Sequence, residues 1–192
     1  MARLTNKKRA QINKQLWERA NNSHRQRWQT LSQKGFDFYL NEQLSKREVD
    51  ALEESGMPTF IINRVTPIIE IMKYFVTANN PRWKAVGATG DDVDTAQVHS
   101  EIAEYCWYLS NGKSLYSQVI LDSLTKGVGY FLVDVDKDSD RGMGEVLFKR
   151  VDPYDVYIDP ASRDFLLRDA TFVTIRKNLS RSKLINMLPD HA

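Results

Sequence analysis

The N-terminal part of the chain places apolar residues at helical spacing among polar ones. Over residues 6–33 they recur every three or four positions: Ile12, Leu16, Ala20, His24, Trp28 and Leu31. This pattern predicts a helix with one narrow apolar stripe. Asn21, Asn22 and Ser23 favour turns over helix, so two shorter helices are an alternative. Such a helix docks on a neighbour, which is either the same chain or another subunit.

Residues 35–76 change from a polar pattern to an apolar one. Residues 35–58 are rich in charges and turns, and the spacing of Ser45 and Glu48 predicts a capping box that begins a short helix. Residues 60–76 are apolar on most faces, with Pro67 in the first helical turn after the candidate caps Asn63 and Thr66. A helix that is apolar nearly all round needs cover on several sides, so we expect it to be the central core helix.

The next segment predicts a brief strand at 82–86 and then two helices. The first runs from Asp91 or Asp92 to about Asn111, and the second covers 114–126 and ends at Gly127, where a left-handed residue is wanted. We expect the first of these helices to turn the following residues inward: Val93, Ala96, Ile102, Ala103, Cys106 and Leu109.

The C-terminal part has a residue pattern that is typical of strands. The β-branched and aromatic runs 128–135 and 146–151, joined by the polar loop 136–145, predict a hairpin, and 154–158 and 170–176 predict further strands. Ser180 is expected to cap a last helix that carries Leu184, Ile185 and Leu188. Helices followed by strands and a terminal helix indicate an α+β class. We expect a helical arm over 1–34 and an α+β body over 35–192.

Charge is distributed unevenly along the 192 residues, although the net charge is only +2. Residues 1–34 hold nine Lys and Arg against Glu18 alone, a charge of +8, which leaves −6 for residues 35–192. This asymmetry favours contact with nucleic acid or an acidic protein surface. The alternative is a solvated basic helix. The candidate contact residues are Arg3, Lys7, Lys8, Arg9 and Lys14.

Composition excludes some classes of protein. No apolar run reaches the roughly 18 residues that a membrane span needs, so we expect no membrane partner. Cys106 is the single cysteine, which excludes an internal disulfide and fits a reducing compartment. His24, His99 and His191 lie far apart in the sequence, without the spacing of metal ligands. We therefore expect no metal and no cofactor.

Two segments resemble ligand-binding loops only in part. The run from Asp134 to Glu145 has acidic or small residues at several EF-hand positions, but Ser139 stands where the loop needs glycine. A hairpin tip is the better interpretation, with adventitious calcium binding as the alternative. Gly112, Lys113 and Ser114 end like a phosphate-binding loop, but Trp107 occupies the position of its upstream glycine. We interpret that segment as a turn between helices.

Three carboxylates form the remaining candidate site. Asp152, Asp155 and Asp159 with Lys149 would suit a metal-dependent nuclease. However, Asp152 and Asp159 each precede a proline, which is typical of turns. The residues alone thus predict a binding or structural protein. A nuclease and a monomeric basic nucleic-acid-binding module remain as alternatives.

A series of short motifs resembles the portal proteins of podovirus-type tailed phages, in their N-terminal, wing part. In chain order they lie at 36–39, 56–65, 80–83, 90–92, 126–130, 151–160, 169–173 and 188–189. The most specific is 151–160, Val-Asp-Pro-Tyr-Asp-Val-Tyr-Ile-Asp-Pro. In that family the channel-lining clip, stem and crown regions follow the matched part. We therefore expect this chain to be a fragment or a shortened relative.

The resemblance implies a structural subunit, not an enzyme, in a dodecameric homo-oligomeric ring at one vertex of the virion. The ring would pass double-stranded DNA during packaging and ejection, and subunits would reside in the host cytoplasm during assembly. Its implied partners are the major capsid protein, the terminase large subunit, which hydrolyses the ATP, and tail or adaptor proteins. Within this interpretation Trp17 and Trp28 are candidate anchors on an adjacent subunit.

Overall fold

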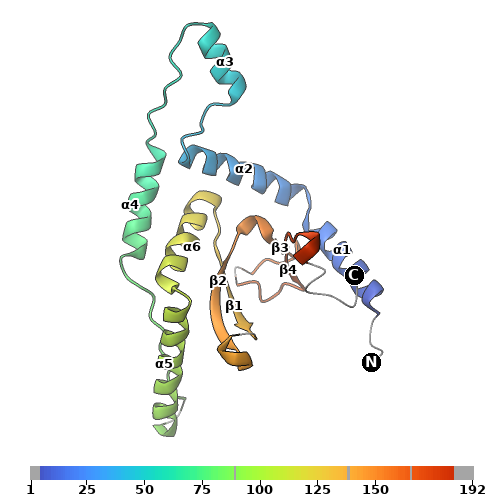
Figure 1. Ribbon diagram of the computed structural model, residues 1–192, viewed down its shortest axis with the longest axis vertical. Helices are drawn as coiled ribbons and strands as arrows, with labels where there is room; N and C mark the ends of the chain where they lie inside the picture. The colour runs from blue at the N-terminus through green and yellow to red at the C-terminus, as the bar shows by residue number, and fades with distance from the viewer. Residues whose placement is uncertain (1–4, 89, 138, 165, 184–192) are drawn as a thin grey trace. The chain divides into compact units, whose positions relative to one another are not determined.

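The computed structural model of the chain describes residues 5–88, 90–137, 139–164 and 166–183. Helices fill the first two thirds of this described part and strands follow them (Figure 1). The helices are α1 Asn6–Ala20, α2 Ser23–Tyr39, α3 Lys46–Glu54, α4 Val65–Thr77, α5 Val93–Leu109 and α6 Gly112–Lys126. The strands are β1 Tyr130–Asp136, β2 Glu145–Val151, β3 Val156–Ile158 and β4 Val173–Ile175. This order confirms the α+β class.

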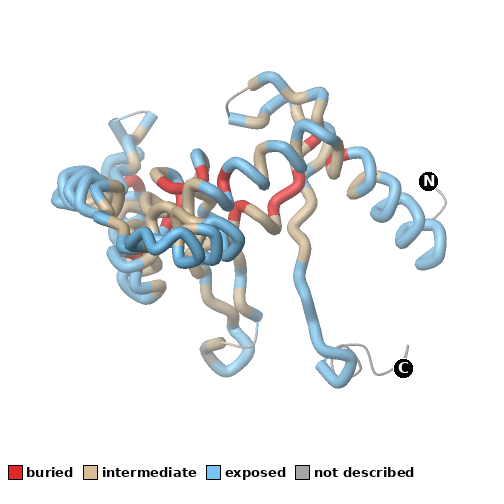
Figure 2. The backbone as a smooth tube through the Cα atoms, turned by 90° about the horizontal axis from the view of Figure 1, so that it is seen from above, coloured by how far each residue is buried: buried red, intermediate tan, exposed pale blue. Residues whose placement is uncertain are grey.

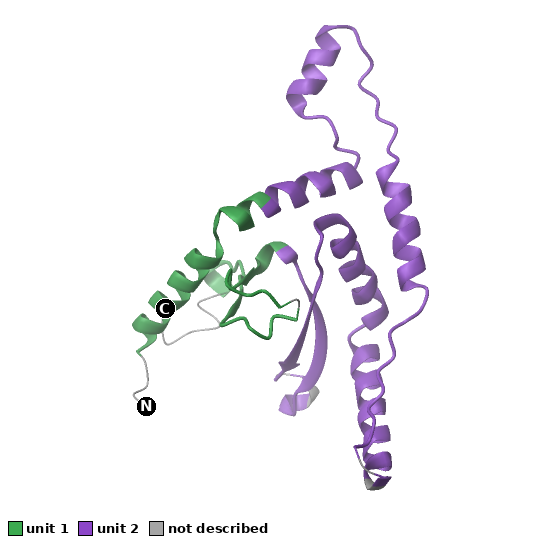
Figure 3. Cartoon of the chain, turned by 180° about the vertical axis from the view of Figure 1, so that it is seen from behind, with its two compact units in different colours: residues 1–27, 154–192 green, residues 28–153 purple. Residues whose placement is uncertain are grey.

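The chain divides into two compact units (Figure 3). One unit comprises residues 28–153, and the other combines residues 1–27 with residues 154–192. The boundaries fall inside α2 and inside the short 3-10 turn Pro153–Asp155. Each unit is described by itself below.

Helix α6 organises the unit of residues 28–153, because α4, α5 and β2 all contact it. The hairpin of β1 and β2 is antiparallel, with Tyr130 opposite Val151 at one end and Asp136 opposite Glu145 at the other. Trp107 packs against Phe148 and Phe131, with ring centroids 5.3 and 6.0 Å apart. Aromatic pairs at this spacing join the end of α5 to the hairpin. The predicted hairpin is confirmed.

The start of α6 requires glycine because Trp107 lies directly over it. Gly112 is buried, and a Cβ atom there would lie 2.1 Å from the indole of Trp107. We therefore expect Gly112→Ala to lower the free energy of unfolding by roughly 1–3 kcal/mol through overpacking. Ser114→Ala, at an exposed position of the same helix, is the matched control in urea unfolding. Equal midpoints for the two variants would contradict this packing.

The second unit is built around a short antiparallel ladder. β3 pairs with β4, with Val156 opposite Ile175 and Ile158 opposite Val173. Helix α1 contacts β3, and the rings of Trp17 and Tyr157 lie 5.9 Å apart. Ala20 and Tyr157 are buried here. This small apolar contact holds the C-terminal end of α1 on the ladder.

Several local signals behave as the sequence predicts. The capping box of Ser45 and Glu48 begins α3. The side chain of Asn63 accepts hydrogen bonds from the backbone N–H groups of Val65 (2.8 Å) and Thr66 (3.1 Å), so Asn63 caps α4. Gly127 ends α6 with a φ of +84°. The predicted break at Asn21 and Asn22 separates α1 from α2.

Other expectations were wrong. Residues 82–86 form no strand; instead Trp83 stacks on Phe148, and the N–H of Ala85 donates to the Ser100 hydroxyl. Helix α2 continues to Tyr39, so the first residues of the segment 35–58, which we expected to be rich in turns, are helical. The expected terminal helix begins at 181–183, and its residues Leu184, Ile185 and Leu188 lie outside the described part.

Burial is sparse in the described part of the chain, as Figure 2 shows by its few red segments. The expectation that 60–76 forms a central core helix was wrong, because no described residue of α4 is buried. The inward set that we expected for α5 was also partly wrong, since Val93 and Ile102 are exposed while Ala96 is buried. Among the described residues no helix is both long enough and apolar enough to cross a membrane.

Candidate assembly surfaces

Helix α4 exposes its apolar face. Ile68, Ile71, Met72 and Phe75, spaced three and four apart, have exposed fractions of 58, 56, 47 and 71%. This spacing places the four side chains on one side of the helix. A soluble amphipathic helix normally buries such a face against its own core. Large contiguous apolar patches on a protein surface mark interaction sites.

The opposite, more polar face of α4 is the one turned toward its own unit. Thr66, Glu70, Lys73 and Thr77 are half-buried. The hydroxyl of Tyr39 at the end of α2 donates to Glu70 at 2.6 Å, and Lys73 pairs with Glu70 at 2.5 Å. These contacts lower the pKa of Glu70, chiefly through Lys73, and raise the pKa of Tyr39 to about 12. Polar bonds therefore fix which face of α4 points outward.

Helix α5 also presents an outward face with apolar residues. Val98, Ile102, Tyr105 and Tyr108 are exposed by 53, 52, 58 and 84%. Asp94, Glu101 and Glu104 are exposed on the same helix. The combination of tyrosines with acidic residues differs from the purely apolar face of α4. It suits a partner that carries positive charge.

The predicted basic contact residues lie on α1, except Arg3, which is outside the described part. Lys7, Lys8, Arg9 and Lys14 are all exposed. Lys14 forms only a loose pair with Glu18, at 3.8 Å, between side chains that are 74 and 54% exposed. The positive charge of α1 is therefore available to a partner.

Both tryptophans that we expected at a subunit interface have neighbours within their own unit. Trp17 packs on Tyr157, and the indole N–H of Trp28 donates to the carbonyl of Lys126 at 3.1 Å. Each is half-buried in the isolated chain. Whether either ring also contacts another subunit remains a prediction.

A buried carboxylate anchors α1 in its unit. Asp159 is 2% exposed and accepts hydrogen bonds from the N–H groups of Ala161 (3.1 Å) and Thr171 (3.3 Å). Arg19 of α1 lies 3.4 Å from the same carboxylate. These contacts lower the pKa of Asp159, and the hydrogen bond from the Ala161 N–H has the largest effect.

Acid is therefore expected to weaken this anchor. Because the folded pKa lies below the unfolded value of about 3.9, the stabilisation is complete above that value and is lost as pH falls through the folded pKa. We expect Asp159→Asn to destabilise the chain relative to wild type at neutral pH, and the gap to close in acid. Urea unfolding of both proteins at several pH values measures it. A gap that is independent of pH would contradict the assignment.

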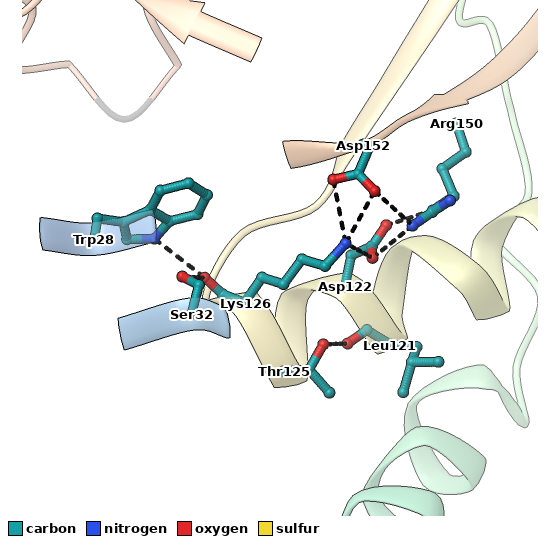
Figure 4. Close-up of polar contacts among 8 residues, drawn as sticks. All are labelled: Trp28, Ser32, Leu121, Asp122, Thr125, Lys126, Arg150 and Asp152. Carbon is teal, nitrogen blue, oxygen red and sulfur yellow. Dashed lines mark hydrogen bonds and ion pairs between the residues drawn. The ribbon is translucent and has the colours of Figure 1, made fainter. Parts of the chain in front are cut away.

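A second group of buried charges forms a cluster at the end of α6 (Figure 4). Lys126 and Asp122 pair at 3.0 Å, and both side chains are only 5% exposed. Arg150 of β2 binds the same Asp122 through two nitrogens. Asp152 accepts from Lys126 at 3.1 Å. The cluster joins α6 to β2 and to the turn that follows β2.

The carbonyl of Lys126 extends these contacts to α2. It accepts hydrogen bonds from the Ser32 hydroxyl at 3.0 Å and from the Trp28 indole. Asp122 and Arg150 form a two-point pair of the kind that fixes geometry as well as energy. In Arg150 this contact with Asp122 raises the pKa. The cluster therefore fixes how α2, α6 and the hairpin pack against one another.

The three carboxylates proposed for a nuclease have other partners. Asp152 belongs to the cluster above, Asp155 accepts from the Arg176 guanidinium at 2.8 Å, and Asp159 binds backbone N–H groups. Lys149 pairs with Asp134 across the hairpin, at 2.9 Å. In the described ranges no three His, Cys, Asp or Glu residues lie close enough together to hold a metal ion. Each carboxylate thus has a structural explanation.

The loop that resembles an EF-hand is the tip of a hairpin. Its flanks are the paired strands β1 and β2, and Asp136 accepts a hydrogen bond from the Ser139 hydroxyl. Asp134 faces Lys149, as above. Strands in place of helices on both sides agree with the hairpin interpretation of 136–145.

Comparison with known families identifies the chain. A family model described as phage P22-like portal protein matches residues 15–192. The chain belongs to this family. Among curated proteins, the search finds no match. Portal proteins of this family are structural parts of the phage particle. A structural role explains the exposed apolar residues on α4 and α5 better than an enzymatic role would.

Sequence reasoning missed the two features that matter most in this portal-family chain. The pair Asp122 and Lys126 has helical i,i+4 spacing within a predicted helix. That spacing was a usable signal, but burial of the pair depends on Arg150, which is distant in sequence. The outward orientation of α4 had no local signal, because it depends on contacts with Tyr39.

Proposed function

We propose that the chain is a structural subunit of the portal ring at one capsid vertex, through which DNA is packaged and ejected. The apolar outward face of α4 carries this proposal. Ile71 and Phe75 are exposed while the polar face of the same helix is bonded to its own unit. A subunit that meets copies of itself needs such a surface, whereas a monomeric enzyme or binding module does not.

In this proposal the ring is a dodecamer that docks the terminase large subunit during packaging, and later tail or adaptor proteins. It contacts the major capsid protein and lies in the virion. The basic residues of α1 supply an external contact with an acidic surface or with DNA phosphates. Family membership supports the structural role, and the pairing of Asp152, Asp155 and Asp159 with basic or backbone groups supports the lack of turnover.

Analytical ultracentrifugation of the purified chain tests the proposal. We expect species well above the 22.2 kDa of one chain, and no cleavage of duplex DNA with magnesium present. A strictly monomeric chain would contradict self-assembly. DNA cleavage that Asp155→Ala abolishes would establish the nuclease alternative.

A further inference from the structure

Helix α5 carries an outward stripe of two acidic residues, a valine and two tyrosines at heptad spacing. Asp94, Val98, Glu101, Tyr105 and Tyr108 are four and three residues apart, so they lie along one side of the helix. All five are exposed. The opposite side is the one that packs inward, through Ala96 and Trp107.

The charge of α5 is entirely negative. No Lys or Arg occurs between Lys84 and Lys113. A groove of about 660 Å³ flanks one edge of α5, but Arg82 and Lys84 line it together with Glu101 and Glu104. The groove is therefore mixed in charge, and the surface that favours a cation is the stripe on α5 itself.

Helix α1 presents a stripe with the same spacing and the opposite charge. Lys7, Gln11, Lys14 and Glu18 follow one another at intervals of four and three, and all are exposed. The inward side of α1 is different, because Trp17 packs on Tyr157 and Arg19 pairs with Asp159. Lys7 and Lys14 therefore point away from their own unit.

The two lysines of the α1 stripe match the two acids of the α5 stripe in number and in distance. Lys7 and Lys14 are seven residues apart, and so are Asp94 and Glu101. Seven residues are about 10.5 Å along a helix. Laid side by side, the two helices pair both lysines with both acids at once, and Gln11 then lies beside the segment around Val98. Each of the two lysines thus has an acid at the matching position on α5 of the same sequence. This correspondence favours contact between two copies of the chain over contact with the regularly spaced phosphates of DNA.

We infer that α1 of one subunit binds the acidic, tyrosine-bearing stripe of α5 on a second copy of this chain. The contact is heterologous, since each copy uses α1 toward one neighbour and α5 toward another, and such contacts form a ring where the rotation between copies closes. The lysine stems cover Val98 and Tyr105, while the ammonium groups reach Asp94 and Glu101. This inference rests on the proposed self-assembly and names a partner for the basic helix.

A charge swap tests it with four versions of the full chain. The first variant carries Lys7→Glu with Lys14→Glu, the second carries Asp94→Lys with Glu101→Lys, and the third carries all four changes. Self-association is measured by ultracentrifugation at low and high salt for each, and for the mixture of the first two. We expect each two-residue variant alone to associate roughly tenfold or more weakly than wild type, because like charges then face each other.

Recovery is the decisive readout. The four-residue variant and the mixture of the two swapped variants both restore opposite charges, so both are expected to regain association and its salt sensitivity. Recovery in the mixture requires contact between different molecules. Failure of both to recover, or wild-type association by either variant alone, would overturn the inference. Lost binding to duplex DNA by the first variant, without recovery in the mixture, would assign α1 to DNA instead.

Matched controls separate this contact from folding and from assembly as a whole. Lys177→Glu with Lys183→Glu changes the same charge at exposed positions outside α1, and it is expected to associate as wild type. Circular dichroism should show the same helix content in all variants. A wild-type chain that stays monomeric would overturn the proposed function. It would overturn the pairing of stripes as well, because wild type already places opposite charges on the two helices. Assembly of wild type and of each swapped variant alike would overturn the pairing alone.

Discussion

Asp122→Ala is expected to lower the free energy of unfolding by about 3–5 kcal/mol, a large part of the stability of a domain of this size. Asp122 and Asp152 both pair with Lys126 and Arg150, but Asp122 is buried while the Asp152 side chain is 37% exposed. Removing Asp122 therefore leaves the 5%-exposed Lys126 side chain with only the more exposed of its two acids. Chemical unfolding followed by circular dichroism measures the change. Stability is lost because a buried positive charge then lacks its buried partner. The intact pair itself contributes little, since removing both charges from water costs much of what their attraction gains.

Two further variants show whether charge is the cause. Lys149→Ala breaks the ion pair of Lys149 with Asp134, in which the two side chains are 45 and 44% exposed. It is expected to lower the free energy of unfolding by at most about 1 kcal/mol. Asp122→Leu combined with Lys126→Met removes both buried charges, and is expected to regain most of the stability that Asp122→Ala loses. An Asp122→Ala variant no less stable than Lys149→Ala would contradict the role of this cluster.

Ile71→Glu with Phe75→Glu is expected to abolish self-assembly and leave the folded subunit intact. Both side chains are exposed in the isolated chain, by 56 and 71%. Glutamate there meets solvent in the monomer, so the free energy of unfolding should change by less than about 0.5 kcal/mol per site. In an assembled interface the same glutamates would be buried without partners, which is strongly unfavourable.

Light scattering and thermal unfolding measure the two effects separately. The variant is expected at the mass of a single chain, with the melting temperature of a wild-type monomer. Met57→Glu, at another exposed apolar position (54%), serves as the control and should assemble normally. Assembly of the α4 variant at wild-type strength would show that this face is not an interface.

The fold was predictable where its signals are local. The capping box at Ser45, the Asn63 cap and Gly127 are set by residues within a turn of the helix ends. The hairpin of β1 and β2 follows from two β-branched runs with a polar loop between them. These features depend on neighbours in sequence, so composition and spacing suffice to place them.

The errors arose where tertiary contacts decide the outcome. The apolar pattern of 60–76 correctly indicated a helix but gave its burial wrongly, because a sequence cannot distinguish a core from a surface that awaits a partner. Trp83 joins an aromatic cluster in irregular backbone and not in a strand. The ion-pair cluster needs Asp122 and Arg150, 28 residues apart, to meet. The basic face of α1 was visible in composition, but its match with α5 required knowing which sides of both helices are exposed.

Negative-stain electron microscopy of the purified wild-type chain shows whether the chain is a structural subunit whose outward helix faces meet other copies of itself. We expect closed rings with a central hole, which the Ile71→Glu, Phe75→Glu variant fails to form. A field of single, dispersed particles for wild type and variant alike would contradict it.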